Sequence, residues 1–187
     1  MSKIQLGFDG VEEAVNTFKE RIEPGVHEIK ILSVTGEENT NGKAYVSIKC
    51  ENLEGTRSHE EKMWATTPAA LDMTAGKLKH LIKAATGKEI KGTLSVEVVN
   101  KVLVNQKVRV KFTCEESEYN GEIYLKTSFG FKGFAESLSV PADKTGLKYD
   151  PNNKWDFRRA VKIKAEAVNY DSVSEEGETE FADDDPF

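Results

Sequence analysis

The sequence contains few of the residues that form disulfides or bind metal ions. Its 187 residues include two cysteines and three histidines. Cys50 and Cys114 lie in segments of alternating apolar residues, which predicts reduced core side chains and no disulfide. The histidines at positions 27, 59 and 80 have no ligand spacing with these cysteines, so we expect no zinc site.

Long apolar runs are also missing. None approaches the ~18 residues of a membrane span, and Met1-Ser2-Lys3 is not followed by the apolar segment of a signal peptide. With 38% hydrophobic residues, the chain can still bury a core of ordinary size. These properties predict a soluble, cytoplasmic protein.

Catalytic signatures are absent as well. The sequence contains no phosphate-cradling glycine loop of the Walker type and no nucleophile motif. Paired acids such as Glu37-Glu38, Glu60-Glu61 and Glu115-Glu116 stand next to turns, as solvated surface residues do. We therefore expect no enzyme and no cofactor, and a metal-dependent nuclease is a remote alternative.

Charge, in contrast, is abundant and unevenly distributed. Residues 171–187 hold eight acids and no bases, whereas the whole chain holds 26 bases and 32 acids. Residues 1–170 therefore keep 26 bases and 24 acids, a net charge of +2, and nine of those bases fall between Lys77 and Lys111. This division is typical of a polyanion-binding surface that an acidic tether can shield. A solvated lysine-rich surface with a solubility tail is the alternative.

The acidic segment 171–187 is expected to be disordered and to act as a docking peptide. It ends in Asp183-Asp184-Asp185-Pro186-Phe187. A solvated acidic run gains nothing from a terminal aromatic ring. We expect Phe187 to enter an apolar pocket of a partner protein, while the aspartates and the terminal carboxylate meet basic residues around that pocket.

Alternation of apolar and polar residues predicts strands at 26–34, 43–51, 57–66, 106–115 and 122–131, with turns at Asn41-Gly42 and Tyr119-Asn120-Gly121. Helical spacing predicts helices over 10–22 and 155–168. Thr67 and Pro68 begin another helix, Thr74 caps a second one, and Gly87 ends it. Residues 93–104 fit either helix or strand, and 133–155 are expected to form a loop. The side chains expected to face the core are Ala44, Val46, Ile48, Cys50, Val108, Val110, Phe112, Cys114, Ile123 and Leu125.

About five strands with a helix after the third follow the element order of the OB fold, a five-stranded Greek-key barrel. We predict a mainly β domain over 1–170 with interposed helices, a core at about 20–135, an extension over 136–170, and the tail 171–187.

The outward side of the predicted strands combines bases with aromatic rings. Single-stranded nucleic acid needs both, because cations neutralise phosphates and each stacked base contributes about 1–3 kcal/mol. A solvated face with cross-strand tyrosines is the alternative. Phe129, Phe131, Phe134 and Trp155 are further stacking candidates, with core as the default for each phenylalanine. The residues predicted to bind nucleic acid are Lys43, Tyr45, Lys49, Trp64, Lys107, Arg109, Lys111, Tyr124 and Lys126.

The segment from Phe181 to Phe187 resembles the acidic tip of bacterial single-stranded DNA-binding proteins. The isoleucine of that tip is absent here, whereas the terminal aromatic ring and its acids are retained. Residues 24–29 and 41–45, the helix that follows, and the hairpin ending near Lys132-Gly133-Phe134 are similar to phage-encoded single-stranded DNA-binding proteins with an OB fold. This second likeness spans about residues 20–135.

The resemblance implies sequence-independent binding of single-stranded DNA during replication, recombination and repair, with the tail recruiting replication proteins. For a bacteriophage protein, the place of action would be the cytoplasm of the bacterial host. A protein-interaction adaptor, in which the tail is the active element and the basic face is incidental, is one alternative. A recombination mediator or annealing protein, which would share the binding surface, is another.

Overall fold

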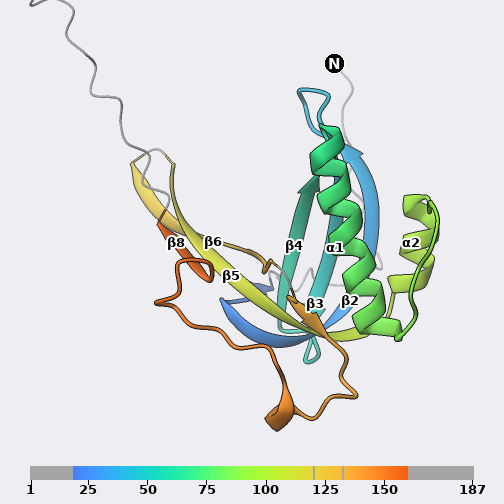
Figure 1. The fold of residues 1–187 in the computed structure, drawn as a ribbon. Coiled ribbons are helices and arrows are strands. Elements are labelled where there is room, and N and C mark those ends of the chain that lie inside the picture. The colour runs from blue at the N-terminus through green and yellow to red at the C-terminus, as the bar shows by residue number, and fades with distance from the viewer. Residues whose placement is uncertain (1–18, 120, 132, 160–187) are drawn as a thin grey trace, which may run out of the picture.

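The computed structural model describes residues 19–119, 121–131 and 133–159, which form a mainly β structure with two α-helices (Figure 1). The helices are α1 (Pro68–Thr86) and α2 (Val96–Leu103), and a short 3-10 helix spans Ala142–Lys144. The strands are β1 (Glu20–Arg21), β2 (Gly25–Glu38), β3 (Ala44–Asn52), β4 (Arg57–Trp64), β5 (Lys107–Tyr119), β6 (Glu122–Phe129), β7 (Ala135–Glu136) and β8 (Phe157–Arg159).

All eight strands belong to one mixed sheet with the order β1-β4-β3-β2-β5-β6, and β7 and β8 both pair with β5. The long β5 changes neighbours along its length. Its first half pairs with β2, its second half pairs with β6, and β8 runs parallel to it from Cys114 to Glu116. As a result, the outer part of the β5–β6 hairpin extends away from the body of the molecule (Figure 1).

The sheet is open, because no backbone ladder joins β4 to β6 in the described ranges. Two side-chain contacts span this gap. Glu61 of β4 accepts a hydrogen bond from the Phe129 N–H at 2.9 Å, and His59 Nδ1 lies 3.5 Å from the Thr127 hydroxyl of β6. The prediction of a mainly β fold with interposed helices is therefore confirmed, whereas a closed five-stranded barrel is not seen in the described residues.

The core lies on the inner side of the sheet, where α1 and α2 cover it. The predicted core residues are confirmed at Val46, Ile48 and Cys50 of β3 and at Val108, Val110 and Phe112 of β5, all of which are buried. The strict alternation was wrong, because the neighbouring residues expected on the outer side are also buried: Tyr45, Ser47, Arg109 and Thr113. Ala44, which was expected to face the core, is exposed. Cys50 and Cys114 are both buried and unbridged, as predicted. Burial raises the pKa of the Cys50 thiol to about 12.

The start and end of α1 were predicted correctly, but its interior was not. The Thr67 hydroxyl accepts a hydrogen bond from the Ala70 N–H, Pro68 stands in the first turn, and Gly87 ends the helix with a φ of 71°. Thr74 does not cap a second helix. It is buried inside α1 and donates to the Trp64 carbonyl at 2.9 Å. Residues 93–104, which were left open, contain α2 with Ser95 as its N-cap.

Four further predictions need correction. Residues 133–155, which were expected to form a loop, contain β7 and the 3-10 helix. Residues 157–159 form β8 instead of a helix, because they pair with β5. Glu20 and Arg21 form β1 beside β4 instead of a helix end. Ile123 and Leu125 are 71% and 50% exposed, because the hairpin that carries them extends beyond the core. The predicted helical residues 10–18 and 160–168 lie outside the described residues, as does the acidic segment 171–187.

Within the described part of the chain, neither helix is long and apolar enough to cross a membrane.

Candidate nucleic-acid interface

A first candidate surface, here called the β3–β4 face, carries the predicted Lys43, Tyr45, Lys49 and Trp64, together with Lys62. Tyr45 and Trp64 are direct neighbours in the antiparallel register of β3 and β4, and their ring centroids lie 5.3 Å apart. Lys62 Nζ lies 5.2 Å from the centre of the Tyr45 ring. The strands thus bring an aromatic pair and a cation together, as a base-stacking surface requires.

Tyr45 is less exposed to solvent than predicted, because its hydroxyl is hydrogen-bonded to a glutamate. Its side chain is 8% exposed, and its hydroxyl donates to Glu37 at 2.7 Å. Hydrogen bonds from Thr35 and Tyr45 hold the pKa of Glu37 below its ordinary value, and the bond to Glu37 raises the pKa of Tyr45. The ring that this face offers to solvent is therefore Trp64, which is 45% exposed. The negative charge of Glu37 offsets part of the positive charge of the lysines.

The predicted basic row on β5 is not an open surface. Lys107 is exposed, but Arg109 is 5% exposed. The guanidinium of Arg109 lies 2.8 Å from Glu28 and 3.5 Å from Glu136, and it donates to the Val140 carbonyl at 2.9 Å. The interpretation of Arg109 as an outward cation was wrong, because β7 and the residues after it cover this part of β5.

Lys111 also forms an ion pair within the fold. Its Nζ lies 2.6 Å from a carboxylate oxygen of Asp156, which is buried. The other Asp156 oxygen accepts the Asp150 N–H at 2.9 Å, and the Asp156 carbonyl accepts the Cys114 N–H at 2.9 Å. Lys111 therefore neutralises the carboxylate that ties residues 150–156 to β5.

Tyr124 and Lys126 lie on the exposed hairpin. The Tyr124 hydroxyl accepts a hydrogen bond from Ser117 at 3.1 Å, and Lys126 forms an exposed ion pair with Glu115 at 3.4 Å. Both side chains are accessible. Among the described residues, neither of them forms a hydrogen bond, ion pair or cation–π contact with Tyr45 or Trp64.

A second surface consists of Phe131, Trp155, Lys77, Lys154 and Arg158, and we call it the Phe131–Trp155 cluster. Only its two aromatic rings were among the stacking candidates predicted from the sequence. Phe131 and Trp155 are 51% and 57% exposed, and their ring centroids lie 6.4 Å apart. The guanidinium of Arg158 lies 4.5 Å from the Phe131 ring centre and 5.3 Å from that of Trp155. Lys77 lies over the Phe131 ring at 5.7 Å, and Lys154 lies over the Trp155 ring at 5.2 Å.

Segments far apart in the chain position this cluster. Lys77 comes from α1, Phe131 follows β6, and Arg158 lies in β8. The turn that presents Trp155 is held by Asn153, whose side chain accepts the Trp155 N–H at 3.0 Å. The default assignment of Phe131 to the core was wrong, whereas Phe129 and Phe134 are buried as expected. The available sequence signal was a tryptophan shortly after the turn-forming residues Pro151, Asn152 and Asn153.

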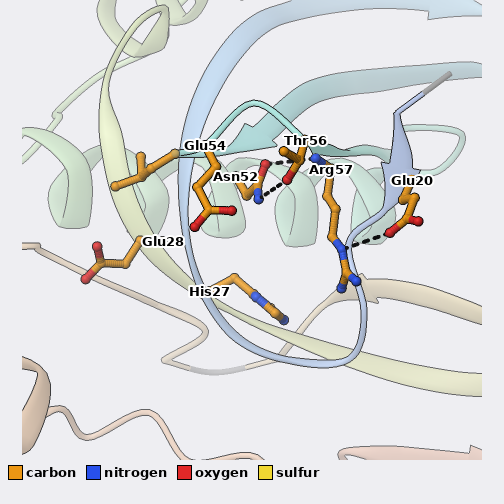
Figure 2. Close-up of a pocket in the computed structure, with 8 residues that line it drawn as sticks. Glu20, His27, Glu28, Asn52, Glu54, Thr56 and Arg57 are labelled. Atoms are coloured by element: carbon orange, nitrogen blue, oxygen red, sulfur yellow. Dashed lines mark hydrogen bonds and ion pairs between the residues drawn. The ribbon is translucent and has the colours of Figure 1, made fainter. Parts of the chain in front are cut away.

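One hollow in the described structure has the opposite electrostatic character (Figure 2). Its volume is about 600 Å³, and three glutamates line it: Glu20, Glu28 and Glu54. Its one arginine, Arg57, pairs with Glu20 at 3.3 Å. An acidic hollow repels phosphates, so it is not a nucleic-acid site.

No protein-family model matches the chain, and a search of the curated proteins also returned no match. Among the described residues, no group of three or more His, Cys, Asp or Glu side chains is arranged to hold a metal ion. The predicted partner-binding residues 183–187 lie outside the described ranges.

Proposed function

We propose that this protein binds single-stranded nucleic acid, with DNA as the ligand and without sequence preference. The observation that supports this most strongly is the placement of the two tryptophans. Both are about half exposed, and each lies beside a second aromatic ring. All five cation–π contacts in the described structure involve these two ring pairs.

Exposed rings beside cations match the two chemical demands of an unpaired strand. Burying such a ring against a base recovers apolar area that the free protein leaves in water. The adjacent cations can then neutralise phosphates and release their counterions. Neither arrangement reads base edges, so the binding it supports is independent of sequence.

The Phe131–Trp155 cluster is the better of the two surfaces. It combines two open rings with three cations, whereas the β3–β4 face has one open ring and a bonded glutamate, Glu37. We assign the main contact to the Phe131–Trp155 cluster and a second contact to Trp64, Lys49, Lys62 and Lys43.

The element order supports an OB-type scaffold as part of this proposal. Counted from β2, three antiparallel strands are followed by the helices α1 and α2 and then by β5 and β6. OB folds bind oligonucleotides on the face of their second and third strands and on the adjoining loops. Those strands correspond here to β3 and β4, which carry Tyr45 and Trp64.

The test is the affinity for a fluorescently labelled oligothymidine, measured by anisotropy. Phe131→Ala and Trp155→Ala should each weaken binding by about 5- to 150-fold, since one stacked base contributes about 1–3 kcal/mol. Trp64→Ala should have a smaller effect. Leu53→Ala is the matched control, because it removes an exposed apolar side chain from the acidic hollow. Unchanged affinity in both cluster variants, with folding intact by circular dichroism, would refute the assignment.

The acidic segment 171–187 retains its proposed role as a docking peptide for replication or recombination proteins. If neither the full chain nor a version without this segment binds oligothymidine, the adaptor function replaces the proposed one. Faster pairing of complementary strands on addition of the protein would instead favour an annealing protein.

A further inference from the structure

The outer edge of β6 is an exposed strand edge with apolar side chains. β6 pairs with β5 along one edge, and no strand among the described residues pairs with the other edge. Residues 122–126 are all exposed, with Ile123 and Leu125 among the most exposed large apolar side chains. An edge of this kind is a template for pairing with another strand.

The hydrogen-bonding groups that this edge presents can be assigned. The Phe129 N–H points away from β5, because it donates to Glu61 of β4. Backbone groups alternate in direction along a strand, so the N–H and C=O of Ile123 and Leu125 point the same way. The backbone groups of Tyr124 then point toward β5, where Tyr124 is the register partner of Ser117.

The sequence of this edge complements itself. Around Tyr124, Glu122-Ile123-Tyr124-Leu125-Lys126 has an acid at one end, a base at the other, and an apolar residue on each side. An antiparallel second copy centred on Tyr124 brings Glu122 opposite Lys126 and Ile123 opposite Leu125. A two-fold axis repeats each contact, as an isologous interface requires.

Neighbouring two-fold registers lose this match. An axis through Ile123 sets Glu122 opposite Tyr124, and an axis through Leu125 sets Tyr124 opposite Lys126. Only the register centred on Tyr124 pairs both charges and both apolar side chains.

We propose that two copies of this chain associate through the outer edges of their β6 strands, in antiparallel register centred on Tyr124. The Ile123 and Leu125 side chains of both copies then form one apolar patch on the same face of a continuous sheet. The contact is small for a specific interface, so we expect dissociation in the micromolar range. This association does not depend on the proposed function, and its test contains no DNA.

The first experiment is a charge swap, with the mass of the full chain measured by sedimentation equilibrium at about 10–200 µM. Glu122→Lys and Lys126→Glu each set like charges opposite each other twice, so each should weaken the dimer by roughly 5- to 30-fold. The double variant restores opposite charges and should recover the wild-type affinity. A monomeric wild type, or a double variant no better than the single ones, overturns the proposal.

The second experiment tests the register of the two β6 strands by disulfide cross-linking. Tyr124 lies opposite itself as a non-hydrogen-bonded pair, with Cα atoms about 4.5 Å apart, so Tyr124→Cys should cross-link the two copies on oxidation. Lys126→Cys is the matched control. In this register its two copies lie about 13 Å apart and should not cross-link. The native cysteines are buried and do not interfere. Equal cross-linking of the two variants, or none in Tyr124→Cys, contradicts the register.

Discussion

Glu136 is a single residue whose charge stabilises the covering of β5. Its carboxylate accepts hydrogen bonds from the Thr145 hydroxyl and the Gly146 N–H, and it lies 3.5 Å from Arg109. The Thr145 bond is the main reason that the pKa of Glu136 is below its ordinary value. A lowered folded-state pKa adds stability above the unfolded-state pKa, and this stability is lost as the pH falls through the folded-state value.

We therefore expect Glu136→Gln to lower the urea unfolding midpoint at pH 7. The difference from the wild type should shrink as the pH falls below about 4, where the wild-type carboxyl becomes protonated. Urea titrations of both proteins across pH 3–7 measure this. A difference that stays constant over the whole range would show that the charge of Glu136 is not the stabilising feature.

A second test on single residues compares Lys111 with Lys107, because both lie on β5 and differ in their surroundings. Lys111→Ala leaves the buried Asp156 carboxylate without its cation, so the free energy of unfolding should fall by about 2–3 kcal/mol. Lys107→Ala changes an exposed side chain and should stay within about 0.5 kcal/mol. Equal effects in urea titrations would contradict the structural role given to Lys111.

Among elements, β4 and β6 are joined by the buried side chains of Glu61 and His59, and Glu61 accepts the hydrogen bond from the β6 backbone. Glu61 is buried and accepts the Phe129 N–H at 2.9 Å, while His59 lies 3.1 Å from the same oxygen. Glu61→Ala should lower the free energy of unfolding by about 2–4 kcal/mol, because a buried N–H loses its acceptor. Glu61→Gln should lose less, because an amide oxygen can still accept that bond. Urea denaturation compares the two, and equal losses would contradict this account of the gap.

Elements defined by local sequence were the ones that the sequence could predict. Thr67, Pro68 and Gly87 predicted the ends of α1, and the alternation in β3 and β5 predicted the core. β8 was missed because its pairing with β5 joins residues more than forty positions apart, such as Arg159 and Glu116. A short apolar pattern does not separate helix from strand without that partner.

The positions of the candidate surface residues could be predicted only in part. Alternation put Arg109 on the outer side of β5, but its partners Glu28, Glu136 and Val140 are distant in sequence and enclose it. Conversely, Phe131 and Trp155 lie in irregular segments, where no periodicity indicates exposure. Cations from α1 and β8 reach them only in the folded chain.

For the whole molecule, the distribution of charge predicts how the acidic segment affects binding. Removing residues 171–187 takes away eight acids and changes the net charge from −6 to +2. Affinity for single-stranded DNA should stay the same or rise, because the segment repels phosphates and can cover basic side chains. Anisotropy titrations of the two chains measure this. A truncated chain that binds more weakly would contradict the separation of the two functions.

In the proposed function, the exposed tryptophans stack on unpaired bases beside cations that contact phosphates. Tryptophan fluorescence, titrated with oligothymidine and with a matched duplex at several salt concentrations, tests it most directly. We expect quenching by the single strand alone. We also expect log affinity to fall linearly with log salt, at about 0.7 for each phosphate contacted. Equal response to the duplex, or no quenching at low salt, would contradict it.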